Sequence, residues 1–329
     1  MTRPRIFSGM RPTGALHLGN LMGALENWVR LQDAYDCVFG IVDWHSLTTD
    51  YADPKAIREN VLEVATDWLA AGLDPTRSRL MLQSLVPEHA ELHLLLSMIV
   101  PLPWLERVPT YKEQQQNIEG KDLSTYGFLG YPLLQTADII VYRANAVPVG
   151  EDQVPHVELA REVVRRFNNF YGEVFPEPQT LLTAAARIPG TDGRKMSKSY
   201  GNAIYLKDTP DEVRKKINPM LTDPRRKRRS DPGEPNECPV FDLHKAFSSA
   251  ETQAWAAEGC RSAWIGCLDC KRKLTEHLLA HLAPIHARRP EYAQRPDTVW
   301  DILREGSRQA RELAQATMVD VRAAMAIRY

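Results

Sequence analysis

The first half of the chain alternates short apolar runs with longer segments in which apolar residues recur every three or four positions. The short runs at residues 5–8, 37–43 and 79–84 predict strands. The helical periodicity between them predicts two helices that each pack one face on a sheet. Its apolar positions are Leu18, Leu21, Leu25, Trp28 and Val29 in the first segment, and Ile57, Val61, Val64, Trp68 and Leu69 in the second. The alternation is typical of the α/β class, here a Rossmann-like, doubly wound parallel sheet.

Strand signals fade after about residue 200. The remainder predicts helices separated by polar turns, including residues 274–282, residues 299–326 and a Pro- and Gly-containing loop at 231–236. A chain of 329 residues is long enough for two structural parts, because single cores stop growing near roughly 250 to 300 residues. We therefore expect a Rossmann-like catalytic domain at residues 1–200 and a C-terminal helical domain at residues 201–329.

Composition places the chain among ordinary globular proteins and excludes disordered and fibrous classes. Apolar residues make up 43% and charged residues 25%, with a net charge of -1. The start at residues 1–5 leads into a strand-like run and shows no secretory signal. The most apolar stretch, residues 92–105, is too short to span a bilayer, which takes about 20 residues, and predicts a buried helix ending in a turn. We expect a cytoplasmic protein with no membrane partner.

Residues 10–20 join the first predicted strand to the first long helix. Backbone N–H groups at such a junction point toward one spot, which suits a phosphate. His17 and Asn20 lie three positions apart and share one helix face, while Gly19 lets a ligand approach the backbone closely. A lone H-x-G pattern is weakly specific, so this segment alone does not establish a site.

A second segment, Gly190 to Ser199, is a glycine-flanked loop that carries Lys195 and Lys198. Its other interpretation is a flexible, solvated turn. Lysines on a closing loop suit a triphosphate, because the charge that builds on a departing pyrophosphate must be met by cations. The five-residue string K-M-S-K-S at residues 195–199 is long enough to be specific.

Together, residues 17–20 and 195–199 resemble the two signature sequences of the class I aminoacyl-tRNA synthetases. Asn20 stands where that family often has a second histidine, and its amide donates a hydrogen bond but cannot carry a proton charge. Residues 42–48, 135–140 and 147–153 are similar to the tryptophanyl members of the class. The resemblance implies activation of L-tryptophan by ATP with Mg²⁺, transfer to tRNA(Trp), and a homodimer.

The resemblance also implies roles for individual residues. The implied catalytic residues are His17, Asn20, Lys195 and Lys198. The implied tryptophan-binding residues are Phe7, His45, Tyr131, Asp138 and Gln153. The implied ATP-binding residues are Arg11, Pro12, Thr13, Gly19, Asn20, Gly150, Glu151, Asp152, Ile188, Lys195, Met196, Ser197, Lys198 and Ser199.

Physical chemistry supports an acidic residue at position 138 as the acceptor of the indole N–H. An indole is a donor only, and a carboxylate makes the stronger, charge-assisted bond. A site built this way rejects an analogue that lacks the donor by roughly 10⁴ to 10⁵. Taken alone, an aspartate at position 138 is more often a helix N-cap or a surface acid than a ligand acceptor, and only the other motifs favour the acceptor role.

Four of the five cysteines cluster in the second half, at Cys238, Cys260, Cys267 and Cys270. In a cytosolic chain this grouping favours metal binding over disulfides, and the ligand set suits zinc or an iron–sulfur cluster. Free thiols are the third possibility. A subgroup of tryptophanyl enzymes carries a [4Fe-4S] cluster on similar spacing, so the resemblance favours the cluster. The remaining thiol, Cys37, lies in a predicted strand and should only pack.

Residues 225–229 form the strongest basic run and precede the cysteine cluster. They are interpreted either as a solvated loop or as a phosphate contact, and their place in the helical domain favours the second, with Arg261, Lys271 and Arg272 as companions. Three alternative functions remain for the chain: a tyrosyl enzyme, a small adenylyltransferase of the H-x-G-H type, and an inactive paralogue that binds RNA or senses redox state.

Overall fold

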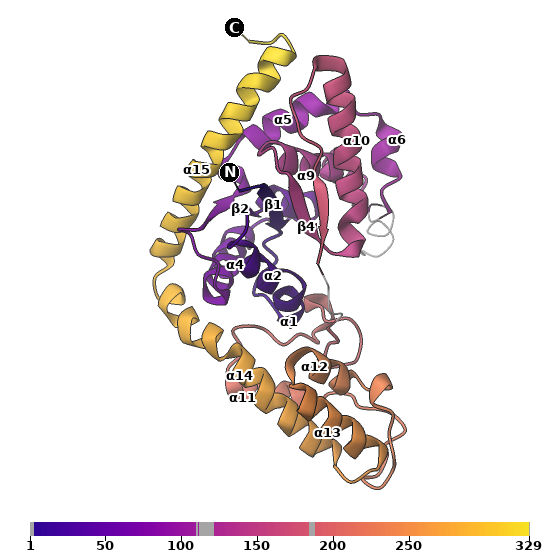
Figure 1. The fold of residues 1–329 in the computed structure, drawn as a ribbon. Coiled ribbons are helices and arrows are strands. Elements are labelled where there is room, and N and C mark those ends of the chain that lie inside the picture. Colours follow the sequence, from indigo (N-terminus) through magenta and orange to yellow (C-terminus); the bar gives the residue numbers. More distant parts are fainter. Residues whose placement is uncertain (1–2, 110, 112–121, 184–187, 329) are drawn as a thin grey trace.

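The computed structural model of the chain describes residues 3–109, 111, 122–183 and 188–328. Its centre is a parallel sheet with the strand order β3-β2-β1-β4-β5 (Figure 1). The strands are β1 (Arg5–Met10), β2 (Asp36–Ile41), β3 (Ser78–Leu82), β4 (Ala146–Val149) and β5 (Gln179–Leu182). The doubly wound α/β class is confirmed. The sequence pattern predicted β1 to β3 but missed β4 and β5, which are short and of which β4 contains Pro148.

Successive strand residues bury their side chains on opposite faces of the sheet. Ile6 and Phe39 join the core covered by α2 (Glu26–Leu31) and α4 (Ile57–Ala71). Phe7 and Val38 join the core covered by α9 (Tyr131–Ile140) and α10 (Val154–Tyr171). Both faces are therefore apolar, as expected for parallel strands with helices on each side. This sandwich leaves the carboxyl ends of the strands as the place where polar side chains can gather.

The helices of the first half partly follow the predicted periodicity. They are α1 (Leu18–Asn20), α2 (Glu26–Leu31), α3 (Asp43–Asp50), α4 (Ile57–Ala71), α5 (Glu88–Ser97), α6 (Leu102–Glu106), α8 (Tyr126–Leu129), α9 (Tyr131–Ile140) and α10 (Val154–Tyr171). A π-helical turn, Leu21–Leu25, separates α1 from α2, so the first predicted helix is interrupted. The second predicted helix is α4, and both bury their apolar stripes as expected.

The stretch 92–105 does contain a helix that ends in a turn, as predicted, but a second short helix follows the turn and part of the stretch is exposed. The stretch contains the end of α5 and most of α6, with a break around Pro101. Leu94, Met98 and Leu102 are each more than half exposed, at 55%, 68% and 56%. The break follows from proline, which lacks the N–H that a helix interior needs and restricts the residue before it.

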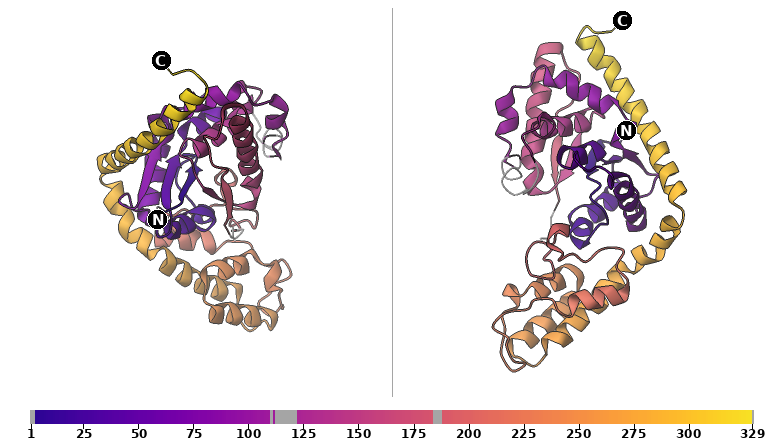
Figure 2. Two further views of the ribbon diagram at one scale, coloured as in Figure 1. Left: turned by 45° about the horizontal axis from the view of Figure 1, so that its top comes forward. Right: turned by 180° about the vertical axis from the view of Figure 1, so that it is seen from behind.

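The second half is helical, as predicted: within residues 188–328 the only β-structure is two isolated bridges. The helices are α11 (Pro210–Ile217), α12 (Pro239–Phe247), α13 (Ala250–Arg261), α14 (Cys267–Ala293) and α15 (Pro296–Ala324). Helices α11 to α14 form a lobe below the sheet, which we call the helical lobe, and α15 returns along the sheet (Figures 1 and 2).

Helix α15 packs directly against strand β3. A Cβ on Gly306 would lie 2.1 Å from the carbonyl oxygen of Leu80, so only glycine allows this approach. Ser307 Oγ accepts a hydrogen bond from the Leu82 N–H at 2.9 Å, which satisfies a donor of the edge strand. The last helix is therefore part of the sheet layer rather than of the helical lobe.

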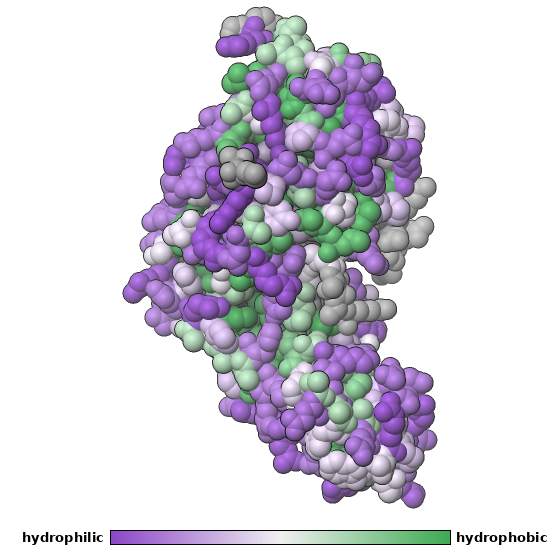
Figure 3. Space-filling view, in the orientation of Figure 1, coloured by the Kyte–Doolittle hydropathy of each residue, from purple (hydrophilic) through white to green (hydrophobic). Residues whose placement is uncertain are grey.

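Figure 3 shows a mostly hydrophilic face, with hydrophobic residues in separate patches over both parts of the molecule. Among the described residues, every helix is too short or too polar to cross a membrane.

Candidate functional site

A cavity of about 320 Å³ opens beside the carboxyl ends of β1 and β4. These strands are neighbours in the sheet, and the chain leaves them in opposite directions, toward β2 and toward β5. Ligands of doubly wound sheets bind at such a switch point. The cavity is lined by all five residues predicted to bind the amino acid, namely Phe7, His45, Tyr131, Asp138 and Gln153, and also by Arg11 and Gly150.

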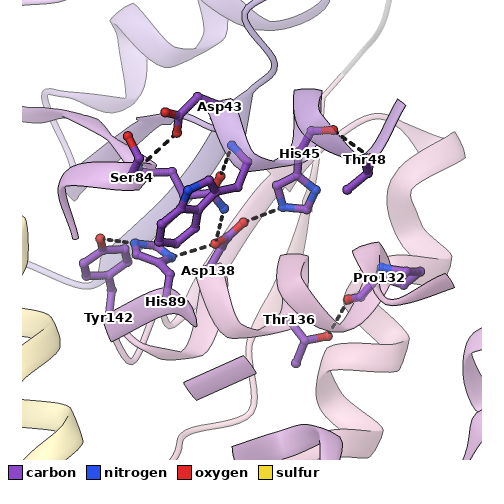
Figure 4. Close-up of polar contacts among 11 residues, drawn as sticks. Asp43, His45, Thr48, Ser84, His89, Pro132, Thr136, Asp138 and Tyr142 are labelled. Carbon is purple, nitrogen blue, oxygen red and sulfur yellow. Dashed lines mark hydrogen bonds and ion pairs between the residues drawn. The ribbon is translucent and has the colours of Figure 1, made fainter. Parts of the chain in front are cut away.

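Asp138 lies at the buried end of this cavity, on α9, and is 1% exposed. Its Oδ2 accepts a hydrogen bond from His45 Nε2 at 2.8 Å, and its Oδ1 accepts from His89 Nδ1 at 2.6 Å (Figure 4). Gln83 Nε2 donates to the same Oδ1 at 2.7 Å. Both alternatives left open by the sequence are wrong, because Asp138 lies inside a helix that begins at Tyr131 and is not on the surface.

Burial by itself raises the pKa of Asp138, but the hydrogen bonds and charges of His45 and His89 outweigh it and hold the pKa well below its usual range. The side chain is therefore a carboxylate at neutral pH and acts as an acceptor only. Sequence reasoning missed Gln83 and His89. The only indication of them in the sequence is that a buried aspartate requires hydrogen-bond donors, and the sequence does not show which residues those donors are.

At the junction after β1, His17 is the N-cap of α1. Its Nδ1 accepts a hydrogen bond from the Gly19 N–H at 3.1 Å, and Asn20 Oδ1 accepts from the His17 N–H at 3.1 Å. Burial, together with the charges of Lys198 and Lys195, lowers the pKa of His17 to about 4. The imidazole is thus neutral at pH 7, and because Nδ1 is an acceptor, its remaining hydrogen is on Nε2 and is available to a phosphate oxygen.

The predicted second loop reaches this junction. Lys198 Nζ donates to the carbonyl oxygens of Gly14 and Thr13, at 2.7 and 3.0 Å. Gly14 has a φ of +95°, a conformation that favours glycine and turns its carbonyl toward the lysine. Burial lowers the pKa of Lys198 to about 8, although Asp67 and Glu63 nearby raise it. The structure therefore places Lys198 at the β1–α1 junction, and Lys195 is near enough for its charge to lower the pKa of His17.

Two buried residues hold the loop in shape. Met196 is 4% exposed in the core, and its N–H donates to the Ile188 carbonyl at 3.1 Å. Asn202 Oδ1 accepts from the Ser197 N–H at 2.8 Å, and its Nδ2 donates to Asp192 at 2.7 Å. Asn202 was not predicted. The side chains of Met196 and Ile188 lie in the core, so any contact they make with a nucleotide would come from the backbone.

The other residues predicted to bind ATP flank these loops. Pro12, Thr13 and Gly19 belong to the β1–α1 junction, while Glu151 and Asp152 form an exposed turn after β4, and Ser199 is exposed on the second loop. The Arg11 guanidinium, whose pKa burial lowers, donates to Thr49 Oγ1 at 2.5 Å. Arg11 is thereby held at the wall of the cavity between the two loops and the amino-acid site.

All four clustered cysteines line one second, small cavity in the helical lobe. Cys238 precedes α12, Cys260 lies on α13, and Cys267 and Cys270 lie on the first turn of α14. Burial, followed by the neighbouring cysteines, raises the pKa of the Cys270 thiol to about 12. Within the described ranges, no three His, Cys, Asp or Glu side chains are close enough to share a single ion. Cys37 is buried in β2, as predicted.

The basic run is partly structural. Arg225 pairs with Asp223 and Glu237, and Arg226 donates to the carbonyl of Ile265 at 2.9 Å. Lys271 was wrongly predicted as a phosphate contact: it is 6% exposed and donates to the carbonyls of Asn218 and Met220, at 2.7 and 2.6 Å. The remaining residues of the run, 227–229, are exposed.

Comparison with known proteins finds similarity over nearly the whole chain. A family model described as tRNA synthetases class I (W and Y) matches residues 1–283. A tryptophan--tRNA ligase of Thermotoga maritima is 53% identical over 323 residues, covering 98% of this chain and 98% of that protein. One of Ralstonia nicotianae is 47% identical and covers 99% of both chains. The crystal structure of tryptophanyl-tRNA synthetase from Campylobacter jejuni, complexed with ADP and tryptophan, is 32% identical with a TM-score of 0.88, covering 98% of this chain and 99% of that one.

Proposed function

The chain belongs to the class I tRNA synthetases specific for tryptophan and tyrosine, and we propose roles for its residues in the reaction of the tryptophan enzymes. It acts as a tryptophan--tRNA ligase. The carboxylate of tryptophan attacks the α-phosphorus of ATP, and pyrophosphate leaves. The terminal ribose hydroxyl of tRNA(Trp) then attacks the adenylate carbonyl, and AMP leaves.

The observation that carries the choice of amino acid is the buried carboxylate of Asp138 in a cavity that the rings of Phe7 and Tyr131 also line. It accepts the indole N–H, while Phe7 and Tyr131 enclose the ring and Gln153 lies where it can meet the amino group. Removing such an acceptor leaves the indole donor unpaired, which typically costs 1 to 3 kcal/mol.

In the activation step the protein supplies position and charge, since little covalent chemistry is required of it. The neutral His17 donates from Nε2 and Asn20 from its amide to phosphate oxygens. Lys195 and Lys198 close over the triphosphate, which arrives with Mg²⁺, and stabilise the departing pyrophosphate. For this, Lys198 exchanges the carbonyls of Thr13 and Gly14 for phosphate oxygens.

ATP–pyrophosphate exchange measured with each of the twenty amino acids tests the proposal. Exchange with tryptophan alone supports it. Exchange with tyrosine alone would indicate the tyrosyl rival. Exchange with neither, combined with binding of the RNA, would indicate the inactive paralogue, and adenylyl transfer without charging of tRNA would indicate the small adenylyltransferase.

We propose residues 1–200 as the catalytic domain and residues 201–329 as the helical region that meets the anticodon arm of the tRNA. Because α15 packs on β3, the contact with RNA falls to the helical lobe of α11 to α14. The exposed cations at residues 227–229 and at Arg272 lie in that lobe and support this assignment.

We also propose that the four cysteines hold a [4Fe-4S] cluster. The four cysteines line one small cavity in the helical lobe, which supports the proposal. Soft thiolate ligands also suit an iron–sulfur cluster, and zinc is the alternative for the same four sulfurs.

Visible absorption and the iron-to-sulfide ratio of anaerobically purified protein test the cluster. A brown protein with equal iron and sulfide supports it, and Cys267→Ser should then lose the absorption. Colourless protein with one equivalent of zinc would refute it. Either result leaves the activation chemistry unchanged, because none of the cysteines lines the substrate cavity.

Finally, we propose that the protein is a cytoplasmic homodimer. Leu94 on α5, Met98 just after α5 and Leu102 on α6 expose apolar side chains, and exposed apolar side chains gathered in a patch mark association surfaces. Sedimentation should show a dimer for the native chain and a monomer for Leu102→Glu. Leu221→Glu, a control in the helical lobe at a residue 56% exposed, should remain dimeric. A native monomer would refute the proposal.

A further inference from the structure

The acceptor positions of Asp138 can be counted. A carboxylate offers about four lone-pair positions. Gln83 and His89 occupy two on Oδ1, at 2.7 and 2.6 Å, and His45 occupies one on Oδ2, at 2.8 Å. One position on Oδ2 therefore remains, and an indole has one N–H to donate.

The His89 ring is itself oriented by Tyr142, which lies at the ring nitrogen that does not face Asp138. Its Nε2 lies 2.6 Å from the hydroxyl of Tyr142, and both side chains are fully buried (Figure 4). Burial, with the charges of Asp138 and Glu88, raises the pKa of Tyr142 well above its ordinary value, so the hydroxyl keeps its proton and donates it to Nε2. With Nε2 accepting this hydrogen bond, the ring N–H is on Nδ1, which faces Asp138.

We propose that Tyr142 and His89 are positioning residues for recognition of the amino-acid side chain. Tyr142 selects the His89 tautomer, and His89 with Gln83 saturates Oδ1, so that the one free acceptor position is on Oδ2. None of these three residues lines the cavity, so they act through Asp138 and not on the substrate. The inference rests on the proposed role of Asp138 as the indole acceptor.

The test compares tryptophan with β-(benzothienyl)alanine, in which sulfur replaces the indole N–H. For Tyr142→Phe, kcat/KM for activation of tryptophan should fall about tenfold, the typical effect of a lost buried hydrogen bond. The value for the sulfur analogue should change less than twofold. The ring of Tyr142 packs on Phe7, with centroids 5.5 Å apart, and phenylalanine keeps that contact.

Two further variants make the test independent of folding defects. His89→Asn keeps an N–H near the position of Nδ1 and needs no tautomer selection, so adding Tyr142→Phe to it should cause no further loss of discrimination. Tyr171→Phe is the matched control, because its ring packs on Phe167 and its hydroxyl has no hydrogen bond within the described part of the chain.

Equal losses for tryptophan and the sulfur analogue in Tyr142→Phe would overturn the inference, since they would show a packing role only. An unchanged ratio in a folded Tyr142→Phe protein would also overturn it. If the native enzyme activates tryptophan and the sulfur analogue equally, the acceptor role of Asp138 is refuted instead. That outcome contradicts the proposed function, and it differs from the outcomes that contradict only the roles of Tyr142 and His89.

A separate observation concerns the surface of the helical lobe. Trp264 is 54% exposed and meets Trp255 edge to face, with centroids 5.9 Å apart. The next residue, Ile265, accepts the hydrogen bond from Arg226, so the basic run lies against the segment that carries Trp264. Arg229 and Arg272 both pair with one carboxylate, that of Asp269, so two cations share a single anion there.

We infer that Trp264 stacks on an unpaired base of the bound RNA, while the exposed cations of residues 227–229 meet its phosphates. Exposed aromatic rings beside cations are how proteins bind unpaired nucleotides, because every base offers a flat face. The edge contact with Trp255 holds the ring of Trp264 and leaves its exposed surface to the RNA. This inference rests on the proposed contact of the helical lobe with tRNA.

Binding of tRNA(Trp) and of its anticodon stem-loop tests the inference. Trp264→Ala should weaken both about tenfold or more, since stacking contributes about 1 to 3 kcal/mol per base, and Trp264→Phe should restore part of the loss. Pyrophosphate exchange should be unchanged in both variants. Phe170→Ala, at another ring that is 54% exposed, is the matched control and should bind normally.

Unchanged RNA binding by Trp264→Ala would overturn the stacking role, and a parallel loss of pyrophosphate exchange would show a structural defect instead. If the stem-loop does not bind even the native protein, while exchange with tryptophan is normal, the assignment of the helical lobe fails and the catalytic proposal stands.

Discussion

Asp138 and Lys198 are the central charged groups of two neighbouring regions, and their surroundings differ. Asp138 is 1% exposed and accepts hydrogen bonds from three side chains on other elements. Lys198 lies on a partly exposed loop and, among the described residues, donates hydrogen bonds to oxygens of Thr13 and Gly14 alone. The Asp138 carboxylate is held in place by three side chains, whereas the Lys198 ammonium can exchange its two backbone carbonyls for other oxygens.

This difference indicates that one region is suited to recognising the amino acid and the other to stabilising the leaving group. Recognition of one side chain benefits from an acceptor that is already oriented and desolvated before the substrate arrives. Stabilisation of a departing pyrophosphate requires cations that move with the reaction. The amino-acid pocket should therefore lose specificity when it is changed, and the loop should lose rate.

The largest expected effect is on rate and comes from Lys198→Ala. The single-turnover rate of adenylate formation should fall about 10²- to 10³-fold, as for the loss of one donor that meets developing charge. The dissociation constant for tryptophan, measured by titration, should stay within about twofold. Lys207→Ala is the control, because Lys207 pairs with Glu63 and is not part of the loop. An unchanged single-turnover rate would show that Lys198 has no role in the step.

Asp138→Asn should lower kcat/KM for tryptophan by about 10²-fold. The new amide has two N–H donors, which would face the donors of Gln83, His45 and His89. The loss of the buried carboxylate should also lower the free energy of unfolding by about 3 kcal/mol. Kinetics with tryptophan and thermal unfolding measure the two effects. Full activity in this variant would mean that the indole is held elsewhere.

Asn202→Ala should reduce the activation rate by about tenfold with no change in tryptophan affinity. The substitution removes the acceptor of the Ser197 N–H and the donor to Asp192, so the loop loses its shape without losing a lysine. Steady-state kinetics with ATP varied should detect it. If tryptophan binding falls as much as the rate, the two regions are not independent in the way described.

The smallest expected effect is on pH dependence. The pKa of Lys198 in the free enzyme is lowered to about 8, so this lysine loses its proton at a lower pH than an exposed lysine does. Because the cation is the active form, kcat/KM for ATP should decrease as pH rises through 8, to about one quarter at pH 8.5. Lys198→Arg should remove the decrease, since arginine keeps its charge. A flat native profile from pH 7 to 9 would contradict the assignment.

Much of the architecture follows from local patterns. Alternating and helical periodicities predicted β1 to β3, α4 and the helical second half, because burial of one face leaves a regular trace in the chain. The two segments proposed to bind phosphate were also visible, since glycines and lysines in short loops have local reasons to be there. The four cysteines and Cys37 were separated correctly by spacing alone.

Long-range contacts were decided only by the tertiary structure. Gln83 and His89 meet Asp138 across 55 and 49 positions of sequence, and Lys198 meets Gly14 across 184. Local periodicity reports which face of an element is buried, but not which distant side chain will satisfy a buried charge. For the same reason Lys271 looked like a cation for RNA, although folding turned it inward to two carbonyl oxygens, and α15 looked like part of the helical lobe, although Gly306 lets it lie against β3.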